Sequence, residues 1–538
     1  MKQKVVALFI TLLVINVFTV ACSKSPHATV QETLLPSEVW IDDDFNESTP
    51  GWGLTHFQKI QDGINAVVEG GTVHVSSGTY CENVIVNRTI ILIGENKSST
   101  IIDGNYTRNI VVSITTDTVS IEGFTIQNCI YLGQERGGIN IDSSFNNVSG
   151  VNFRENWIDI SIYGMHNKID SCVFNSSFLN IEIWSNSNSI ISNQFSYCYR
   201  AISFQASFDN TVENNSILHA YTGILMQESY ENRIKNNAIS NCLTSTITIG
   251  SNSRRNLIVA NTLSSSEQGI TIDFGSSNNT FFHNTFMNNG VQVSSNLAEN
   301  TWDNGYPSGG NYWSDCNGTD LYSGRYQNET GSDGIGDTSY SIDENNQDRY
   351  PLMKPWTNIA ILDISPSKTV VGKGFTLHIY VSVQNQGWNT ETLNITAYAN
   401  ATTITTLMNI AITGRNSSTL TLIWNTTGFA KGNYTIWAYA WPVPGEKEID
   451  TADNNCTDGW IVVTWQGDLT DENHLTPPGG VPDMKVDEND LWYFCAAFID
   501  YYKIHVKDAN CDFDNNCKID EDDLWTFCGA FIDYWKAH

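Results

Sequence analysis

The octapeptide NSIISNQF, residues 188–195, is the first of five similar stretches in the middle of the chain. Each has Asn at its first and sixth positions and an apolar residue at its third and eighth. The later copies begin, at spacings of 22, 22, 24 and 23 residues, at Asn210, Asn232, Asn256 and Asn279. A further short alternating stretch follows most copies. A fixed period near 22 residues with short β-runs indicates a coil of the chain that stacks on itself.

Alternation within each run sends every second side chain inward, and stacking places equivalent positions about 4.8 Å apart. This pattern predicts a parallel β-helix. Leucine-rich repeats have a similar period but need Leu at fixed inner positions, and these columns hold Ile, Val and Phe. The recurring Asn residues are expected at corners, since Asn tolerates left-handed backbone geometry and its side chain can bond the neighbouring turns.

The composition excludes one large class of partner. The 538 residues include 28 Lys and Arg against 58 Asp and Glu, a formal net charge of −30. Every cation that could neutralise a phosphate is outnumbered about two to one by carboxylates, so we expect no nucleic-acid partner. The length predicts several structural units.

The first residues predict export. Lys2 and Lys4 precede an apolar run that ends near Ala21 and Cys22, as in a secretory signal peptide. We therefore expect a secreted, cell-surface protein, with residues 1–22 as signal peptide or N-terminal anchor and residues 23–37 as linker. Simple cleavage, a retained anchor and lipidation at Cys22 all remain open. No later stretch is long and apolar enough to predict a membrane-spanning helix.

A short helix is expected to cover the first coil. Thr55-His56-Phe57-Gln58 has the form of a capping box, and one apolar helical face follows from Phe57 to Val68. Gly70-Gly71 would end this helix. Such a cover would protect the open edge of the first strands from pairing with another chain.

Residues 38–356 resemble a known family. The opening segments are Trp40 to Asp44, Gly78-Thr79-Tyr80 and Ile101-Ile102-Asp103-Gly104. The closing ones are Asn311 to Asp315, Asp333 to Asp337 and Asp348 to Leu352. Together they resemble the NosD-type, pectin-lyase-like right-handed β-helix proteins of microbial surfaces. The resemblance implies the fold, and by itself it implies no chemistry.

A surface for carbohydrate is expected on the third strand of the coils. Its outward positions include Asp142, Gln205, Gln227 and Asp273, polar side chains that could bond a surface polysaccharide. Catalysis on this fold would need paired carboxylates on neighbouring coils. The sequence shows no such pair, so we favour a non-catalytic protein, with a polysaccharide lyase or hydrolase as the alternative. The simplest interpretation of these outward positions is that they only contact solvent.

Residues 357–465 read as short alternating strands separated by turns such as Asn385-Gln386-Gly387. This spacing predicts an antiparallel β-sandwich. The segments Pro444-Gly445-Glu446 and Asp450 to Asn454 resemble the CARDB family of immunoglobulin-like domains. The resemblance implies a role in spacing or adhesion.

The last unit, residues 466–538, contains a duplication. The segment from Asp490 to Tyr501 recurs 33 residues later, from Asp523 to Tyr534. Counting back from Asp523 gives a twelve-residue loop with oxygen ligands at the positions of an EF-hand calcium site: Asp512, Asp514, Asn516, the Lys518 carbonyl, Asp520 and Asp523. The sequence therefore predicts bound calcium.

The unit resembles a dockerin-like module, which implies docking to a cohesin-like protein. Cys517 stands where Gly normally permits the sharp turn of the loop, and affinity would fall accordingly. The first copy is interrupted by an insertion, and its expected calcium ligands are Asp468, Asp483, Asp487 and Asp490. The Cys residues of this unit have spacings suited to disulfides, although their connectivity stays open.

Overall fold

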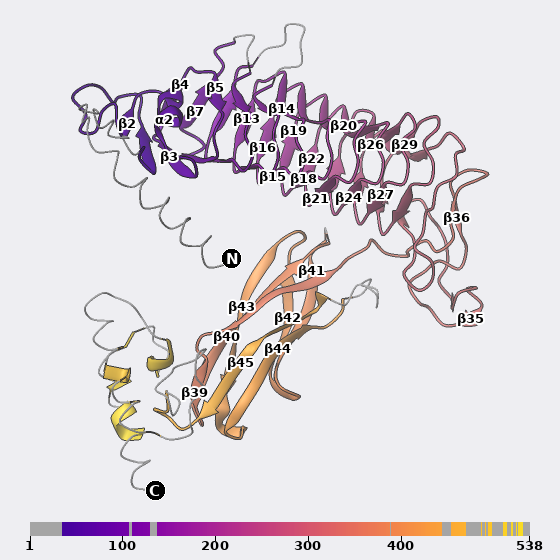
Figure 1. Ribbon diagram of the computed structural model, residues 1–538. Coiled ribbons are helices and arrows are strands. Elements are labelled where there is room, and N and C mark those ends of the chain that lie inside the picture. The colour runs from indigo at the N-terminus through magenta and orange to yellow at the C-terminus, as the bar shows by residue number, and fades with distance from the viewer. Residues whose placement is uncertain are drawn as a thin grey trace, which may run out of the picture.

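The computed structural model describes residues 35–106, 110–129, 137–387, 389–443, 453–469, 486, 490, 493–495, 497, 509–513, 518–519, 523–524 and 526–530. The expected signal segment, residues 1–22, lies outside them. In Figure 1 a long solenoid leads into a body of antiparallel strands and then to a short C-terminal part. The described residues contain no helix of the length and apolarity that crossing a membrane requires.

Three parallel sheets run the length of the solenoid. The first sheet contains β1 (Glu38–Ile41), β2 (His56–Phe57), β3 (Gly71–Val75), β6 (Ile90–Gly94), β9 (Ser120–Glu122), β12 (Asn147–Ser149), β15 (Lys168–Asp170), β18 (Ser189–Ile191), β21 (Thr211–Glu213), β24 (Arg233–Lys235), β27 (Leu257–Val259) and β30 (Thr280–Phe282).

The second sheet contains β4 (Gly78–Tyr80), β7 (Thr100–Asp103), β10 (Thr125–Gln127), β13 (Asn152–Arg154), β16 (Val173–Asn175), β19 (Gln194–Ser196), β22 (Ser216–Leu218), β25 (Ala238–Ser240), β28 (Thr262–Ser264), β31 (Thr285–Met287) and β33 (Tyr312–Trp313). The third contains β5 (Val84–Val86), β8 (Val112–Ile114), β11 (Ile139–Ile141), β14 (Ile158–Ile162), β17 (Leu179–Ile183), β20 (Arg200–Gln205), β23 (Thr222–Gln227), β26 (Ser245–Gly250), β29 (Gln268–Ile272) and β32 (Val291–Ser294). The predicted parallel β-helix is confirmed.

Apolar columns fill the interior, as predicted. Ile190, Val212 and Ile234 pair in register along the first sheet, and each is fully buried. In the second sheet Phe174 and Phe195 stack with ring centroids 4.6 Å apart. Burying an aliphatic or aromatic side chain of this size contributes about 1.5–3 kcal/mol relative to its exposed state, so the repetition of one column supplies much of the solenoid's stability.

The Asn columns form continuous ladders. In one ladder the backbone N–H of Asn193 donates to Oδ1 of Asn215 at 2.9 Å, and that of Asn215 donates to Oδ1 of Asn237 at 3.0 Å. The Nδ2 groups donate along the same file. Left-handed backbone geometry occurs one residue earlier than predicted, as at Ser192 and Asn214 with φ of 58° and 60°. The ladder Asn residues therefore satisfy the turns and do not themselves adopt the left-handed conformation.

The covering helix α2 (Ile60–Ala66) is present, but the predicted capping box is wrong. His56 and Phe57 form strand β2, and the N-cap residue Lys59 makes no side-chain cap hydrogen bond. Glu82 from the following coil caps the helix instead. Its carboxylate accepts the N–H groups of Ile60 at 2.9 Å and Gln61 at 3.2 Å.

The other end of the solenoid is closed by a tail with two hairpins, β34 (Tyr322–Ser323) with β35 (Glu329–Thr330) and β36 (Tyr340–Ser341) with β37 (Gln347–Asp348). Asp348 is buried and accepts the Asn311 N–H at 2.7 Å and the Trp313 Nε1–H at 2.9 Å. The tail thus fixes the last coil.

Two antiparallel sheets follow, as predicted for a sandwich. One contains β38 (Ile359–Pro366), β40 (Thr376–Asn385) and β43 (Ser417–Asn425). The other contains β39 (Val370–Gly372), β41 (Glu391–Ala399), β42 (Thr402–Ile412), β44 (Gly432–Ala440) and β45 (Asn455–Thr464), with β39 parallel to β45. Their inner side chains form one core around Trp424. Among the described residues, Thr426–Gly428 and Ala509–Cys511 form the short 3₁₀ helices η1 and η3.

Candidate functional site

The four side chains predicted on the third sheet lie in one file along the solenoid. Gln205 and Gln227 pair in register, and Gln227 pairs with Gly250. Asp142 and Asp273 occupy the equivalent position, directly after β11 and β29. A binding role for these four residues stays a prediction.

Two aromatic residues of the same file were not predicted. Tyr163 directly follows β14 and Trp184 directly follows β17, so they fill the coils between Asp142 and Gln205. They are 36% and 40% exposed, and their ring centroids lie 6.4 Å apart. The offset from the third strand, which identified Gln205, also identifies them once the upstream coils are aligned.

A second aromatic file lies at the opposite end of the same strands. Trp157, Phe178, Tyr199 and Tyr221 each occupy the position directly before a third-sheet strand. Successive ring centroids are 4.1, 4.8 and 4.8 Å apart. The Arg200 guanidinium lies 5.1 Å from the centre of the Tyr199 ring.

Between the two files run outward-facing polar side chains. Ile160 and Ile162 point into the core, so Ser161 between them faces outward, and Glu182 and Ser203 pair with it in register. They are only 1%, 7% and 1% exposed. We call this surface, bounded by the two aromatic files, the third-sheet face. These three side chains are nearly covered, so the accessible groups of the face are the rings of the two files and the polar side chains Asp142 and Gln205, with successive coils about 4.8 Å apart.

One acid beside this face points inward. Asp159 is fully buried, and its carboxylate accepts hydrogen bonds from Asn156, Ser177 and Asn180 at 2.9, 2.8 and 2.7 Å. Burial raises its pKa to about 7, although the three hydrogen bonds oppose the shift. It therefore ties adjacent coils together and is inaccessible to a ligand.

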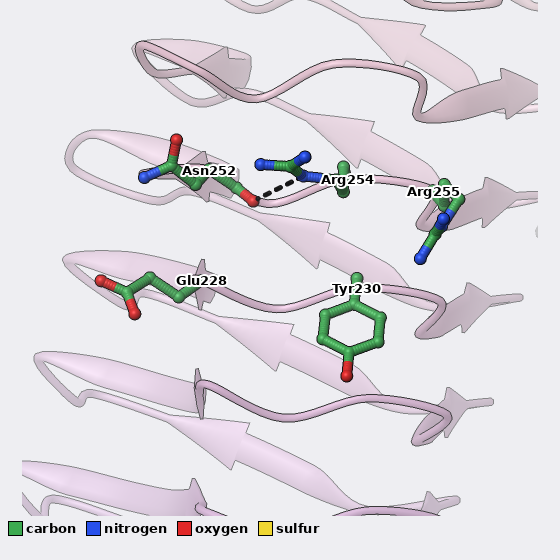
Figure 2. A pocket seen from close by; sticks show the side chains of 5 residues that line it. All are labelled: Glu228, Tyr230, Asn252, Arg254 and Arg255. Carbon is green, nitrogen blue, oxygen red and sulfur yellow. Dashed lines mark hydrogen bonds between the residues drawn. The ribbon is translucent and has the colours of Figure 1, made fainter.

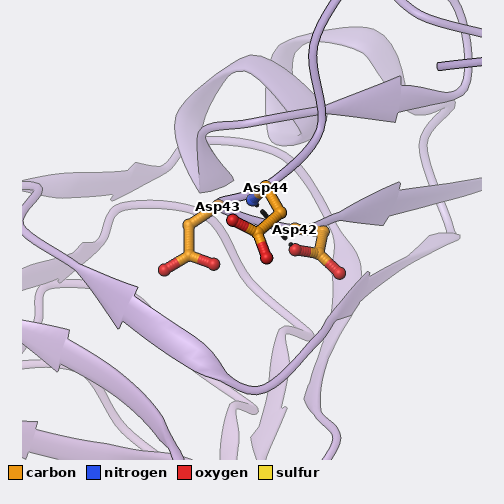
Figure 3. Close-up of side chains that lie close together, drawn as sticks. All are labelled: Asp42, Asp43 and Asp44. Atoms are coloured by element: carbon orange, nitrogen blue, oxygen red, sulfur yellow. Dashed lines mark hydrogen bonds between the residues drawn. The ribbon is translucent and has the colours of Figure 1, made fainter. Parts of the chain in front are cut away.

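Three acids near the N-terminal end lie close together. Asp42, Asp43 and Asp44 place carboxylate oxygens within 4.8 Å of one another (Figure 3). Asp42 Oδ1 accepts the Asp44 N–H at 3.0 Å, and Asp43 Oδ2 accepts the Thr79 N–H at 3.3 Å. A Cβ at Gly78 would lie 2.8 Å from the Asp43 carboxylate. The Asp43–Thr79 hydrogen bond connects the segment after β1 to β4.

The predicted calcium ligands are described in part. Asp512, Asp523, Asp468 and Asp490 are buried, at 3%, 0%, 0% and 1% exposed, and Lys518 is exposed. The remaining predicted ligands lie outside the described residues: Asp514, Asn516, Asp520, Asp483 and Asp487.

The two copies have matching geometry. Asp523 Oδ1 accepts the Phe513 N–H at 2.5 Å, and Asp490 Oδ1 accepts the Leu469 N–H at 2.7 Å. Phe494 and Phe527 lie four residues after Asp490 and Asp523, respectively. Their rings stack with centroids 5.0 Å apart. The equivalence makes Asp468 the counterpart of Asp512, so the insertion of the first copy falls inside its loop.

The body of antiparallel strands contacts the start of both copies. Lys368 Nζ donates to the Asp512 carbonyl at 2.8 Å, and the Thr464 hydroxyl donates to the Asp468 carboxylate. Asn510 Oδ1 accepts the Thr369 and Val370 N–H groups at 3.0 and 3.2 Å. These contacts fix the first residue of each loop.

Comparisons with known proteins extend this description. Residues 137–286 match the family model for the right handed beta helix region. No curated protein matches the chain. A CARDB domain from Pyrococcus furiosus, solved with di-metal ions, is 21% identical and covers 20% of this chain and 96% of its own, with a TM-score of 0.18.

Two carbohydrate-related structures are similar at lower identity. XylC in complex with xylose is 11% identical and covers 47% of this chain and 69% of its own, with a TM-score of 0.39. DFA-IIIase from Arthrobacter chlorophenolicus A6, with DFA-III, is 11% identical and covers 51% and 87%, with a TM-score of 0.36. Residues 137–286 form a right-handed β-helix, and CARDB domains are among the structural neighbours of the chain.

Proposed function

We propose that this chain is an exported, non-catalytic surface protein of the NosD-like type, whose third-sheet face binds an extended glycan. The observation that supports this proposal is the file with Asp142, Tyr163, Trp184 and Gln205 on successive coils. The second aromatic file lies at the opposite end of the same strands. Ring surfaces bury the apolar faces of sugars, while amide and carboxylate groups bond their hydroxyls. The repeat of about 4.8 Å presents these groups along a line, which suits a chain-like ligand.

The spacing of the acids supports binding without hydrolysis. Glycosidases hold their two carboxyl groups about 5–10 Å apart. Asp142 and Asp273 are separated by six coils, which at about 4.8 Å per coil places them roughly 29 Å apart. Asp159 is buried behind the face. The alternative, a carbohydrate-active enzyme, would need a second acid close to Glu182.

The binding experiment compares two tryptophans. In calorimetry with neutral and acidic oligosaccharides, Trp184→Ala should weaken binding at least about 10-fold, the equivalent of about 1.4 kcal/mol. Trp40, in β1 of the first sheet and 38% exposed, is matched to Trp184 at 40%, and Trp40→Ala should leave affinity unchanged. Equal effects of the two changes would refute the assignment of the face.

A product assay separates binding from catalysis. The full chain is incubated with acidic polysaccharides, and unsaturated or reducing ends are measured. No product is expected. Turnover that disappears in Glu182→Gln would replace the binding function with an enzymatic one.

We further propose that the C-terminal unit binds calcium and, like the dockerin modules that it resembles, docks to a cohesin-like protein. Four buried carboxylates in two equivalent arrangements support this, since Ca²⁺ prefers oxygen ligands and a binding ion would offset their charge. Calcium should raise the melting temperature through binding linkage. The double change Asp512→Ala and Asp523→Ala should abolish the rise, and absence of heat in calorimetry at millimolar calcium would contradict the proposal.

Export has its own test. When the full chain is expressed in a secreting host, we expect it at the cell surface, with its mature N-terminus near Cys22. Mass spectrometry of that terminus distinguishes cleavage, lipidation and a retained anchor. A full-length protein found only inside the cell would refute export.

A further inference from the structure

A pocket opens beside the third-sheet face. It has a volume of about 500 Å³ and is lined by Glu228, Tyr230, Asn252, Arg254 and Arg255 (Figure 2). These residues come from the turns that lead from the third sheet to the first in two adjacent coils. Glu228 directly follows Gln227 of the third-sheet face. A ligand on that face therefore lies next to this pocket.

The pocket contains the only two adjacent basic residues of the sequence, Arg254 and Arg255. Arg255 is neutralised locally, with Nε 3.0 Å from a Glu231 carboxylate oxygen. Arg254 donates through Nε to the Asn252 carbonyl at 3.4 Å. In the part of the chain that the structure describes, no carboxylate lies within 4.0 Å of its guanidinium. Arg254 thus offers a positive charge on a strongly acidic molecule.

The aromatic residue of the pocket, Tyr230, is held in place by the preceding coil. Tyr230 stacks on Phe208 with ring centroids 5.0 Å apart, and its backbone bridges to Arg254 in the next coil. The Arg255 guanidinium lies 5.8 Å from the centre of the Tyr230 ring. Because ring and guanidinium come from neighbouring coils of a rigid solenoid, the pocket is preorganised for a ligand.

We propose that this pocket binds an acidic sugar unit of the glycan, with Arg254 bonding its carboxylate or sulfate group. This inference rests on the proposed function of the third-sheet face. A guanidinium is suited to two parallel hydrogen bonds with such an oxyanion. Glu228 accepts hydrogen bonds from hydroxyl groups and repels a free anion, so the mixture of charges fits a ligand that carries both an oxyanion and hydroxyls.

The test measures affinity of the full chain for two oligosaccharides of equal length, one of galacturonate and one of galactose. Arg254→Gln should weaken galacturonate binding at least about 10-fold and leave galactose binding unchanged. Arg254→Lys should retain part of the preference, since the charge stays while the paired geometry is lost. Arg325, an exposed arginine of the tail, provides the control, and Arg325→Gln should change neither affinity.

Salt and competition complete the test. Raising ionic strength should weaken galacturonate binding to the unaltered protein more than to Arg254→Gln, because only the former contains the ion pair. Equal affinity for both oligosaccharides, or an unchanged preference in Arg254→Gln, would overturn the proposal. Inorganic sulfate binding as tightly as a sulfated sugar would overturn its sugar component. Any of these outcomes, with Trp184 still required for binding, would leave the function of the third-sheet face intact.

Discussion

At the scale of single residues, the solenoid depends on Asn side chains that hydrogen-bond to the backbone of adjacent coils. The Asn215 side chain accepts the Asn193 N–H and donates to the Ile190 carbonyl, the Glu213 carbonyl and the Asn237 side chain. It is completely buried. Removing it would leave groups on three coils without their partner.

We therefore expect Asn215→Ala to destabilise the protein by about 2–4 kcal/mol, because buried polar groups left unpaired cost about 1–3 kcal/mol each. The neighbouring Ser216 is exposed, and Ser216→Ala should change stability by less than about 0.5 kcal/mol. Urea unfolding followed by circular dichroism measures both. A small effect at Asn215 would show that water replaces the ladder.

Asp159 makes stability depend on pH. Burial raises its pKa to about 7, while an unfolded Asp has a pKa of about 3.9. Between these values the folded protein retains a proton that the unfolded chain has released. The stability contributed by Asp159 is therefore fully present below about pH 4 and is lost as pH rises through about 7.

From pH 5 to 7.5 the melting temperature of the unaltered protein should therefore fall relative to that of Asp159→Asn. The difference should become constant above about pH 8. Ser216→Ala, at an exposed position without a titratable group, should give a pH-independent difference. A constant difference for Asp159→Asn would contradict the assigned pKa.

At the scale of elements, the N-terminal helix depends on the coil that it covers. Helix α2 has seven residues, and helices this short are unstable alone in water. Its first N–H groups bond Glu82, while Ile60 and Ile64 enter the core. Burial raises the pKa of Glu82 despite these hydrogen bonds.

Glu82→Ala should weaken the cap by about 1 kcal/mol, the usual cost of losing an N-cap side chain. Faster amide hydrogen exchange is expected for residues 60–66, with the central coils unaffected. Glu47→Ala, at an exposed position, is the control. Unchanged exchange in residues 60–66 would show that packing alone holds the helix.

The sequence predicted elements better than contacts between distant residues. The β-helix was predictable because one period repeats the same apolar and Asn columns. The cap at Glu82 was not, since it joins residues 21 and 22 positions apart in different coils. Tyr163 and Trp184 escaped prediction because the upstream coils lack the full Asn pattern, although their offset from the strand is the same.

At the scale of the whole molecule, contacts join the three parts. The Arg415 guanidinium donates to the Asn214 side chain of the solenoid and, at 2.7 Å, to the Gln386 carbonyl. Its burial lowers its pKa to about 10. At the other end Lys368, 5% exposed, donates to the Asp512 carbonyl. The second predicted loop thus begins against the antiparallel sheets.

If the proposed calcium site exists, its occupancy should stabilise these sheets through that contact. Calcium is expected to raise the unfolding temperature of the sheets, followed by amide hydrogen exchange in β40 and β43, which flank the buried Trp424 side chain. Lys368→Met should reduce this rise, and Lys373→Met, at an exposed position, should not. An equal rise in all three proteins would show that the two parts unfold independently.

The Asn ladder has an evolutionary consequence. Asn188 bonds Asn210, and Asn210 bonds Asn232 through the same atoms at 2.8 and 3.0 Å. Excising residues 210–231 would bring Asn232 to the place of Asn210 and leave an equivalent joint. Recombination between repeats can therefore lengthen or shorten the solenoid by whole coils, because the same Asn–Asn hydrogen bond joins the coils on either side of the change.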